Sequence, residues 1–205
     1  MRFEKGHKAA TRRHVVDVAS RCLRRDGIAA AGIAGIMEEA GLTKGAFSPH
    51  FESKEALVRE ALASALGDQQ HRLDEDQLTD LDLEGAIRGY LNRAHLEAPA
   101  DGCPSAALLP EIARQPLSIR QDYEKALRSY VGTLAALLPG ADSAANRHRA
   151  TAIFSLMVGT LQIARAVPDA AEAERILDSG IQAALHLART RSPGSGTTAS
   201  SGRTR

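Results

Sequence analysis

The sequence is poor in aromatic residues: it has four Phe, three Tyr and no Trp among 205 residues. Alanine and leucine dominate instead, and this composition suits the packing of helices better than a sheet. We therefore expect an all-α protein. A chain of this length can form a small N-terminal domain and a larger helical body, with a sizeable core.

Long apolar runs are absent as well. No stretch of about 18 apolar residues is present, which argues against a membrane-spanning helix. The basic and polar residues 1–13 are not followed by the apolar segment of a signal peptide. The two cysteines, Cys22 and Cys103, do not make a disulfide framework. We therefore expect a cytoplasmic protein without a membrane partner.

Motifs for catalysis and for cofactor binding are missing too. The sequence has no Glu-x-x-His pair for a di-iron site, no phosphate-binding glycine loop and no recurring Ser, His and Asp pattern. In the acidic run 68–82, which we expect to be loop and helix ends, no His recurs at a metal-ligand spacing. These absences argue against an enzyme, and we expect no metal and no cofactor.

Residues 32–51 have the pattern of two short helices joined by a tight turn. Apolar residues at helical spacing, Ile36 among them, predict the first helix. Gly41 supplies a stop where a left-handed backbone costs little. Thr43 is placed to cap a second helix that begins at Lys44. A slim leading turn after a glycine bend is what a helix-turn-helix requires if its second helix is to enter the major groove of DNA.

This stretch resembles the N-terminal signature of the TetR family of transcriptional repressors. The resemblance rests on residues 41–47 and 50–57 and extends over about residues 12–65. It implies a three-helix helix-turn-helix DNA-binding domain over residues 1–52, followed by a helical effector-binding and dimerisation domain over residues 53–191. The Ser-, Gly- and Thr-rich residues 192–205 are predicted to be disordered.

The resemblance also indicates which residues contact DNA. Lys44 can reach a phosphate or a guanine edge, and the small residues after it allow close approach. Lys54 corresponds to a family lysine that contacts phosphate at the start of the next helix, and Arg12 and Arg13 lie on the helix that the family places against the DNA backbone. The residues expected at the DNA are Arg12, Arg13, Thr43, Lys44, Gly45, Ala46, Ser48, His50 and Lys54.

Two residues of the second helix depart from the family pattern. Relatives usually carry an aromatic residue where this chain has Ser48, so reach toward phosphate is reduced. Pro49 removes an N–H inside the short helix, where proline costs about 3 kcal/mol unless the helix bends. We expect the helix to tighten or end near Ser48, with Pro49 to Phe51 forming its last turn.

The charge distribution is uneven although the formal net charge is only +1. Residues 1–25 contain eight Lys or Arg against two acidic residues. A basic arm before a helix-turn-helix can neutralise phosphates and release counterions. The alternative is a solvated, frayed N-terminus.

The remaining pattern is helical throughout. Helices 143–166 and 170–191 have apolar residues on more than one side, so each must bury two faces. The resemblance implies a homodimer in which this pair and its symmetry mate form a four-helix bundle; the alternative is a larger core within a monomer. The other helices are expected over residues 8–26, 54–72, 83–95, 106–114, with a cap at Ser105, and 117–138.

An effector pocket is expected inside the body, where an apolar cavity with few polar groups would suit a lipophilic small molecule. Each candidate lining residue has ordinary core packing as its alternative. Cys103 belongs to a Gly-Cys stretch that resembles one branch of the family, some of whose members sense electrophiles or oxidants; packing or pocket lining is the other interpretation. The candidates are Tyr90, Cys103, Leu108, Glu111, Tyr123, Phe154 and Met157.

These patterns predict a ligand-responsive DNA-binding regulator. Its expected form is a repressor that binds double-stranded DNA at a palindromic operator as a homodimer and is released by a small-molecule effector. The alternative is a helical adaptor or small-molecule-binding protein without operator-specific DNA binding. That alternative leaves the signature at residues 32–54 without a function.

Overall fold

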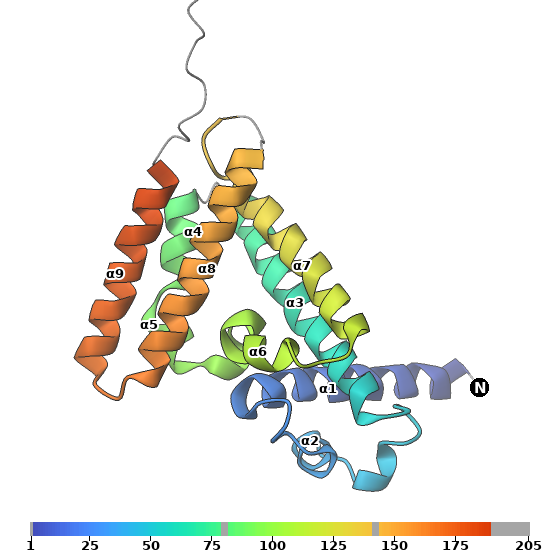
Figure 1. The fold of residues 1–205 in the computed structure, drawn as a ribbon. Helices are drawn as coiled ribbons and strands as arrows, with labels where there is room; N and C mark the ends of the chain where they lie inside the picture. The colour runs from blue at the N-terminus through green and yellow to red at the C-terminus, as the bar shows by residue number, and fades with distance from the viewer. Residues whose placement is uncertain (1, 79–81, 141–143, 190–205) are drawn as a thin grey trace, which may run out of the picture.

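The computed structural model of the protein describes residues 2–78, 82–140 and 144–189, and all regular structure within these ranges is helical (Figure 1). The all-α prediction is confirmed. The tail predicted to be disordered, residues 192–205, lies outside the described residues, as do residue 143 and residues 190–191 at the ends of two predicted helices.

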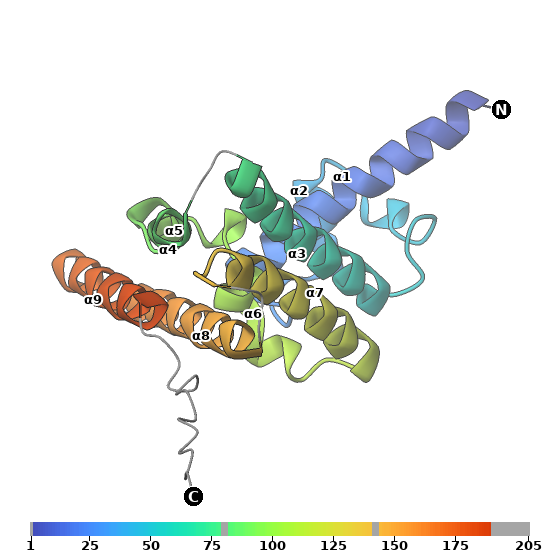
Figure 2. The ribbon, with the colours of Figure 1, turned by 90° about the horizontal axis from the view of Figure 1, so that it is seen from above.

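The N-terminal part, which we call the head, consists of α1 (Arg2–Asp26), α2 (Ile33–Glu39), the 3-10 helix η1 (Lys44–Ala46) and the first half of α3 (Lys54–Leu78). Its helix α1 begins six residues earlier than predicted, and its first turns extend beyond the rest of the molecule (Figure 2). Gly27 ends α1 with a φ of 90°, as its glycine predicts.

The rest of the chain, which we call the body, continues as a series of helices. Helices α8 and α9 lie side by side at one edge of the body, while α3 and α7 pair at the other edge (Figures 1 and 2). The bounds are α4 (Leu83–Tyr90), α5 (Arg93–Glu97), the 3-10 helix η2 (Pro99–Asp101), α6 (Pro104–Ile112), α7 (Leu117–Ala136), α8 (Ala144–Ala166) and α9 (Ala170–Arg189).

Besides the start of α1, three further predicted boundaries are wrong. The single helix expected over residues 83–95 is interrupted, because the Asn92 side chain accepts a hydrogen bond from the His95 N–H at 2.8 Å and starts α5. Helix α3 continues through part of the acidic run to Leu78, because its apolar side remains buried as far as Leu73. Helix α6 starts at Pro104, a favoured first helical residue, and not after a cap at Ser105.

Two hydrophobic cores result, and α6 contributes to both. Leu108 and Ile112 of α6 pack into the head core, together with Ile119 of α7. Cys103, which caps α6, and Ala106 pack into the body core. Helix α3 divides in the same way, since Leu57 to Leu62 belong to the head core and Leu73 to the body core. The head therefore rests on the body through α3 and α6.

Among the described helices, none combines the length and the hydropathy that crossing a membrane requires. Within the same residues, no three His, Cys, Asp or Glu side chains come together as metal ligands would.

Candidate functional site

The turn after α2 is a Schellman motif centred on Gly41. The Gly41 N–H donates to the Glu38 carbonyl at 2.9 Å, and the Leu42 N–H donates to the Met37 carbonyl at 2.8 Å. This arrangement requires a left-handed residue, and Gly41 has a φ of 70°. The predicted glycine stop is confirmed, and it turns the chain sharply toward η1.

The segment after the turn, residues 43–51, is tighter than an ordinary recognition helix. Hydrogen bonds from Ala46 N–H to the Thr43 carbonyl (3.0 Å) and from Phe47 N–H to the Lys44 carbonyl (3.2 Å) define a single 3-10 turn. The Thr43 side chain makes no capping hydrogen bond, so its predicted role as a cap is wrong. Pro49 has no N–H to donate back to Gly45, which is the physical reason for the short helix.

Two rings and one guanidinium hold the end of this segment. The rings of Phe47 and Phe51 stack with centroids 5.5 Å apart, and both residues are buried. The Arg12 guanidinium lies 4.4 Å from the centroid of the Phe51 ring, donates to the His50 carbonyl and pairs with Glu60. Arg12 therefore ties α1 and α3 to the last turn of the segment.

The residues predicted to contact DNA fall into two groups. Arg12 and Lys54 are engaged inside the head, since the Lys54 ammonium donates to the Ile28 carbonyl at 2.9 Å. The others remain accessible for a DNA backbone or base edge: Arg13, Thr43, Lys44, Gly45 and Ser48 are exposed, and Ala46 and His50 are partly exposed.

Arg24 and Glu111 make two of the polar contacts between the head and the body. Arg24 of α1 is buried and donates to the Gly102 carbonyl at 2.9 Å and to the Ser20 hydroxyl at 3.2 Å. Burial lowers the pKa of its guanidinium from the ordinary range. Glu111 of α6 accepts a hydrogen bond from the Ala29 N–H at 3.0 Å. A movement of the loop at Gly102 would therefore act directly on α1. A movement of α6 would act directly on the segment that leads into α2.

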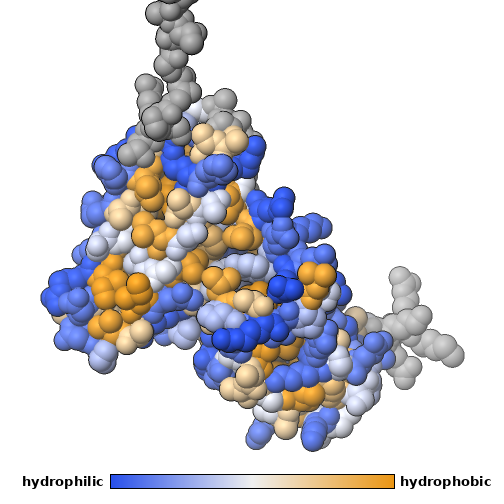
Figure 3. Space-filling model, viewed as in Figure 1, coloured by the Kyte–Doolittle hydropathy of each residue, from blue (hydrophilic) through white to orange (hydrophobic). Residues whose placement is uncertain are grey.

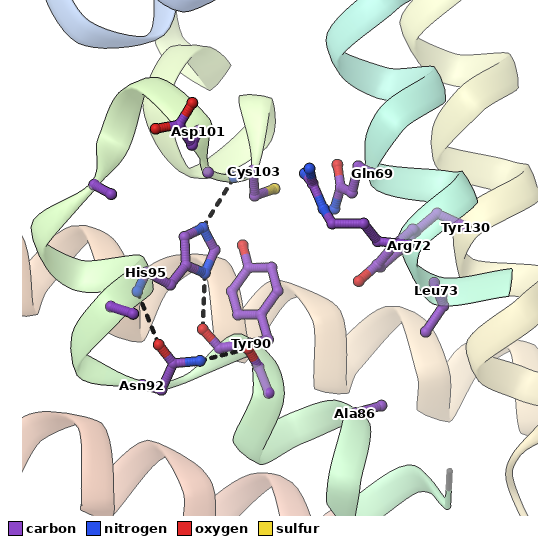
Figure 4. A pocket seen from close by; sticks show the side chains of 14 residues that line it. Gln69, Arg72, Leu73, Ala86, Tyr90, Asn92, His95, Asp101, Cys103 and Tyr130 are labelled. Carbon is purple, nitrogen blue, oxygen red and sulfur yellow. Dashed lines mark hydrogen bonds between the residues drawn. The ribbon is translucent and has the colours of Figure 1, made fainter. Parts of the chain in front are cut away.

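A cavity of about 370 Å³ lies in the body beside that loop (Figure 4). Gln69, Arg72 and Cys103 lie at one end of it, Leu73 and Ala86 lie at the other, and the Tyr90 ring lies between them. The full lining is Gln69, Arg72, Leu73, Ala86, Gly89, Tyr90, Asn92, Ala94, His95, Ala98, Asp101, Gly102, Cys103 and Tyr130.

His95 fixes the loop that closes one side of the cavity. Its Nδ1 lies 2.8 Å from the Tyr90 carbonyl, and the Cys103 N–H donates to its Nε2 at 2.9 Å (Figure 4). A carbonyl only accepts and an N–H only donates, so the two contacts select the neutral ring with its proton on Nδ1. Burial lowers the pKa of His95, as does the charge of Arg165. A Cβ at Gly102 would lie 2.6 Å from this ring, so the loop needs glycine there.

The residues predicted to bind an effector do not line one cavity, although the rings of Tyr90 and Phe154 pack with centroids 6.2 Å apart. Tyr90 and Cys103 line the cavity. Tyr123 and Phe154 border a second hollow of only about 10 Å³, Met157 is fully buried in the body core, Leu108 lies in the head core, and Glu111 holds Ala29.

Sequence reasoning missed Gln69, Arg72 and His95. Gln69 had a usable signal: it lies on the same helical stripe as Ala65 and Leu73, which are buried. A polar residue on an apolar stripe indicates a polar feature inside the fold. Arg72 and His95 had no such signal, because they lie on different elements, α3 and α5, and only the tertiary structure brings them to one cavity.

The head has counterparts of known class. Residues 15–61 match the sequence model of the bacterial regulatory proteins of the tetR family. A comparison with curated protein sequences finds no match.

Solved structures share the fold over nearly the whole chain. A TetR-family transcriptional regulator from Cytophaga hutchinsonii has a TM-score of 0.72 and 19% identity, and covers 90% of this chain and 98% of its own. The reduced form of NemR from E. coli has a TM-score of 0.70 and 18% identity, with 86% and 96% covered. FadR from Bacillus subtilis, in complex with stearoyl-CoA, has a TM-score of 0.60 and 16% identity, with 82% and 95% covered.

A turn followed by a short, largely exposed helical segment, set on a three-helix head, is the arrangement of a helix-turn-helix DNA-binding domain. Residues 15–61 are thus similar in sequence to the TetR-family regulators, and most of the chain shares the fold of solved members of that family.

Proposed function

We propose that the protein is a cytoplasmic repressor that binds a palindromic operator as a homodimer and releases it when a small molecule enters the body. The observation that carries this proposal is the exposed segment 43–48, set after the Gly41 turn in a head that matches the TetR family model. In functional terms we divide the chain at residue 52, since all the residues proposed to contact DNA except Lys54 precede it.

The DNA-facing residues act in two ways in this proposal. Lys44 lies at the start of η1, exposed, and reaches a phosphate or a base edge; Gly45 and Ala46 beside it allow the backbone to approach. Arg13, Thr43, Ser48 and His50 add phosphate contacts. Arg12 and Lys54 hold the carbonyls of His50 and Ile28, so they reach phosphate only by exchanging these partners.

Helices α8 and α9 offer the surface for a second copy of the chain. Ile163 on α8 is 59% exposed, which is unusual for so large an apolar side chain. Figure 3 shows hydrophobic side chains across this side of the molecule. A symmetric partner that covers the same face would complete a four-helix bundle with α8 and α9, and would set two heads at the spacing of two successive major grooves.

The cavity is the proposed effector site. It lies at the loop whose Gly102 carbonyl accepts a hydrogen bond from Arg24, so a ligand that shifts this loop also shifts α1. A ligand that favours one position of the head changes DNA affinity by its differential binding free energy. With about 370 Å³, the cavity is at the small end for ligand pockets, so we propose a much smaller effector than the stearoyl-CoA bound to FadR. Cys103 serves as part of the lining, since its side chain is buried.

Selection from a pool of random duplexes, at two salt concentrations, tests the proposal. We expect enrichment of a palindrome by the wild type and its loss with Lys44→Ala, because direct contacts specify sequence. Arg88→Ala, an exposed arginine of α4 far along the chain from η1, is the matched control and should select the same palindrome. If the wild type enriches no sequence, the helical adaptor replaces the regulator as the better reading.

A further inference from the structure

The cavity contains buried polar groups that have no partner. The Tyr90 hydroxyl and the Gln69 Nε2 lie on residues that are only 8% and 7% exposed, and neither atom finds a hydrogen-bond partner among the described residues. The Cys103 thiol lies near the Tyr90 hydroxyl but is a weak acceptor. Burying a polar group without a partner is unfavourable, so a ligand that offers hydrogen bonds to these two atoms would be stabilised at this end of the cavity.

The same end of the cavity is positively charged. Arg72 lines it and, within the described residues, forms no ion pair. The Arg165 guanidinium lies behind the loop, where it donates to the His95 carbonyl at 2.5 Å and leaves its Nη1 buried without a partner. The one acidic residue of the lining, Asp101, faces Arg21 at 3.5 Å. A negative charge at this end would meet more cationic than anionic groups.

The groups that remain available are mainly donors. An amide N–H₂ and a guanidinium only donate, and a phenol donates readily. Both nitrogens of His95 are already used by Tyr90 and Cys103. An oxygen acceptor would therefore satisfy this end, and a charged acceptor would satisfy it best, since charge-assisted hydrogen bonds are about twice as strong as neutral ones.

The opposite end of the cavity is apolar and suits an apolar part of a ligand. Leu73 and Ala86 form it (Figure 4). At about 30 Å³ for each water-sized group, a volume of about 370 Å³ has room for roughly a dozen non-hydrogen atoms. This size and polarity exclude a bare inorganic anion as the best occupant, because it would leave the apolar end empty.

We propose that the effector is a small organic acid with a short hydrocarbon or aromatic tail. Its carboxylate accepts hydrogen bonds from the Tyr90 hydroxyl, the Gln69 amide and the Arg72 guanidinium, and its tail packs between Leu73 and Ala86. The inference rests on the proposed function in taking the cavity as the effector site, and it names the class of molecule that occupies it.

Calorimetric titration with matched probes tests this assignment in the absence of DNA. The probes are benzoate, phenylacetate, hexanoate and octanoate, each compared with its primary amide. We expect at least one acid to bind at least about tenfold more tightly than its amide, because only the acid gains a charge-assisted contact with Arg72. Failure of all four acids to bind, or equal binding of acid and amide, overturns the proposal.

Paired variants locate the binding. Tyr90→Phe and Arg72→Gln should each weaken the best acid by about tenfold or more. Tyr123→Phe and Arg88→Gln replace the same residue types outside the cavity. They should change the affinity of the protein for the best acid by less than about twofold. Equal losses in the variants and the controls would contradict the site. Because no DNA is present, acid binding without operator binding would refute only the proposed function, and operator binding without acid binding would refute only this inference.

Discussion

The head and the body bury their cores equally well but differ in what they leave unsatisfied. The head core cluster is apolar, although α1 also buries Ser20 and Arg24 and the Nδ1 of His50 is buried without a partner. The residues proposed to contact DNA, such as Lys44, lie on the surface of the head. The body core surrounds a cavity into which Tyr90 and Gln69 bring unpartnered polar atoms. In the proposed function the head therefore acts through its surface, whereas the body acts through the polar groups that line its cavity.

Truncation of a buried core side chain should lower the stability of the protein by a similar amount in the head and in the body. Met37 in the head and Met157 in the body are both fully buried, so replacement of either by Ala should lower the free energy of unfolding by about 2–5 kcal/mol. Chemical denaturation followed by circular dichroism measures this. Leu117→Ala, at a residue 61% exposed, should change it by less than about 0.5 kcal/mol. A small loss at Met37 alone would show that the head core is loosely packed.

Two helical glycines of the body should respond in opposite directions. A Cβ at Gly180 would lie 2.4 Å from Thr160 Cγ2, so Gly180→Ala should cost about 1–3 kcal/mol by forcing α8 and α9 apart. A Cβ at Gly132 in α7 would meet nothing within 4 Å, so Gly132→Ala should gain about 0.5–1 kcal/mol. Thermal unfolding of both variants checks the signs. Stabilisation by Gly180→Ala would disprove the close approach of α8 to α9.

The contact between head and body should have a moderate effect. Glu111→Ala removes the acceptor of the Ala29 N–H and should lower the free energy of unfolding by about 0.5–1.5 kcal/mol, because Ala29 is exposed to water. Glu111→Gln keeps an oxygen in place and should lose less. Urea denaturation of the two variants compares them, and an equal loss would mean that the hydrogen bond is not what joins the two regions.

The smallest expected effect is a pH dependence confined to the body. The native pKa of His95 is lowered by burial, so below the ordinary value of about 6.5 the unfolded chain takes up a proton that the native chain does not. The contribution of His95 to stability is therefore full above that pH and is lost as the pH falls toward its native pKa. Denaturation midpoints at pH 7.5 and 5.5 should differ more in the wild type than in His95→Gln. An equal difference in the wild type and in His95→Gln would contradict the assignment of a neutral His95 ring between Tyr90 and Cys103.

The head was the more predictable region because its determinants are local. Gly41 and Gly27 occupy positive-φ positions that their residue type predicts, and Pro49 shortens the helix in which it lies. Even there, the sequence did not show that Lys54 and Arg12 hold backbone carbonyls of the head. In the body, the helices were mostly predicted, but the cavity was not. Its polar residues come from α3, from the α5 segment and from the loop before α6, and only the packing of these elements defines which of them share a space.

The most direct test of the account is a fluorescence anisotropy titration of the selected palindrome against a shuffled duplex of the same composition, at physiological salt. We predict that the wild type prefers the palindrome by about a thousandfold or more, as specific DNA-binding proteins do, and that two protomers bind each duplex. Equal affinity for the two duplexes would contradict the central claim that the exposed segment 43–48 reads DNA sequence.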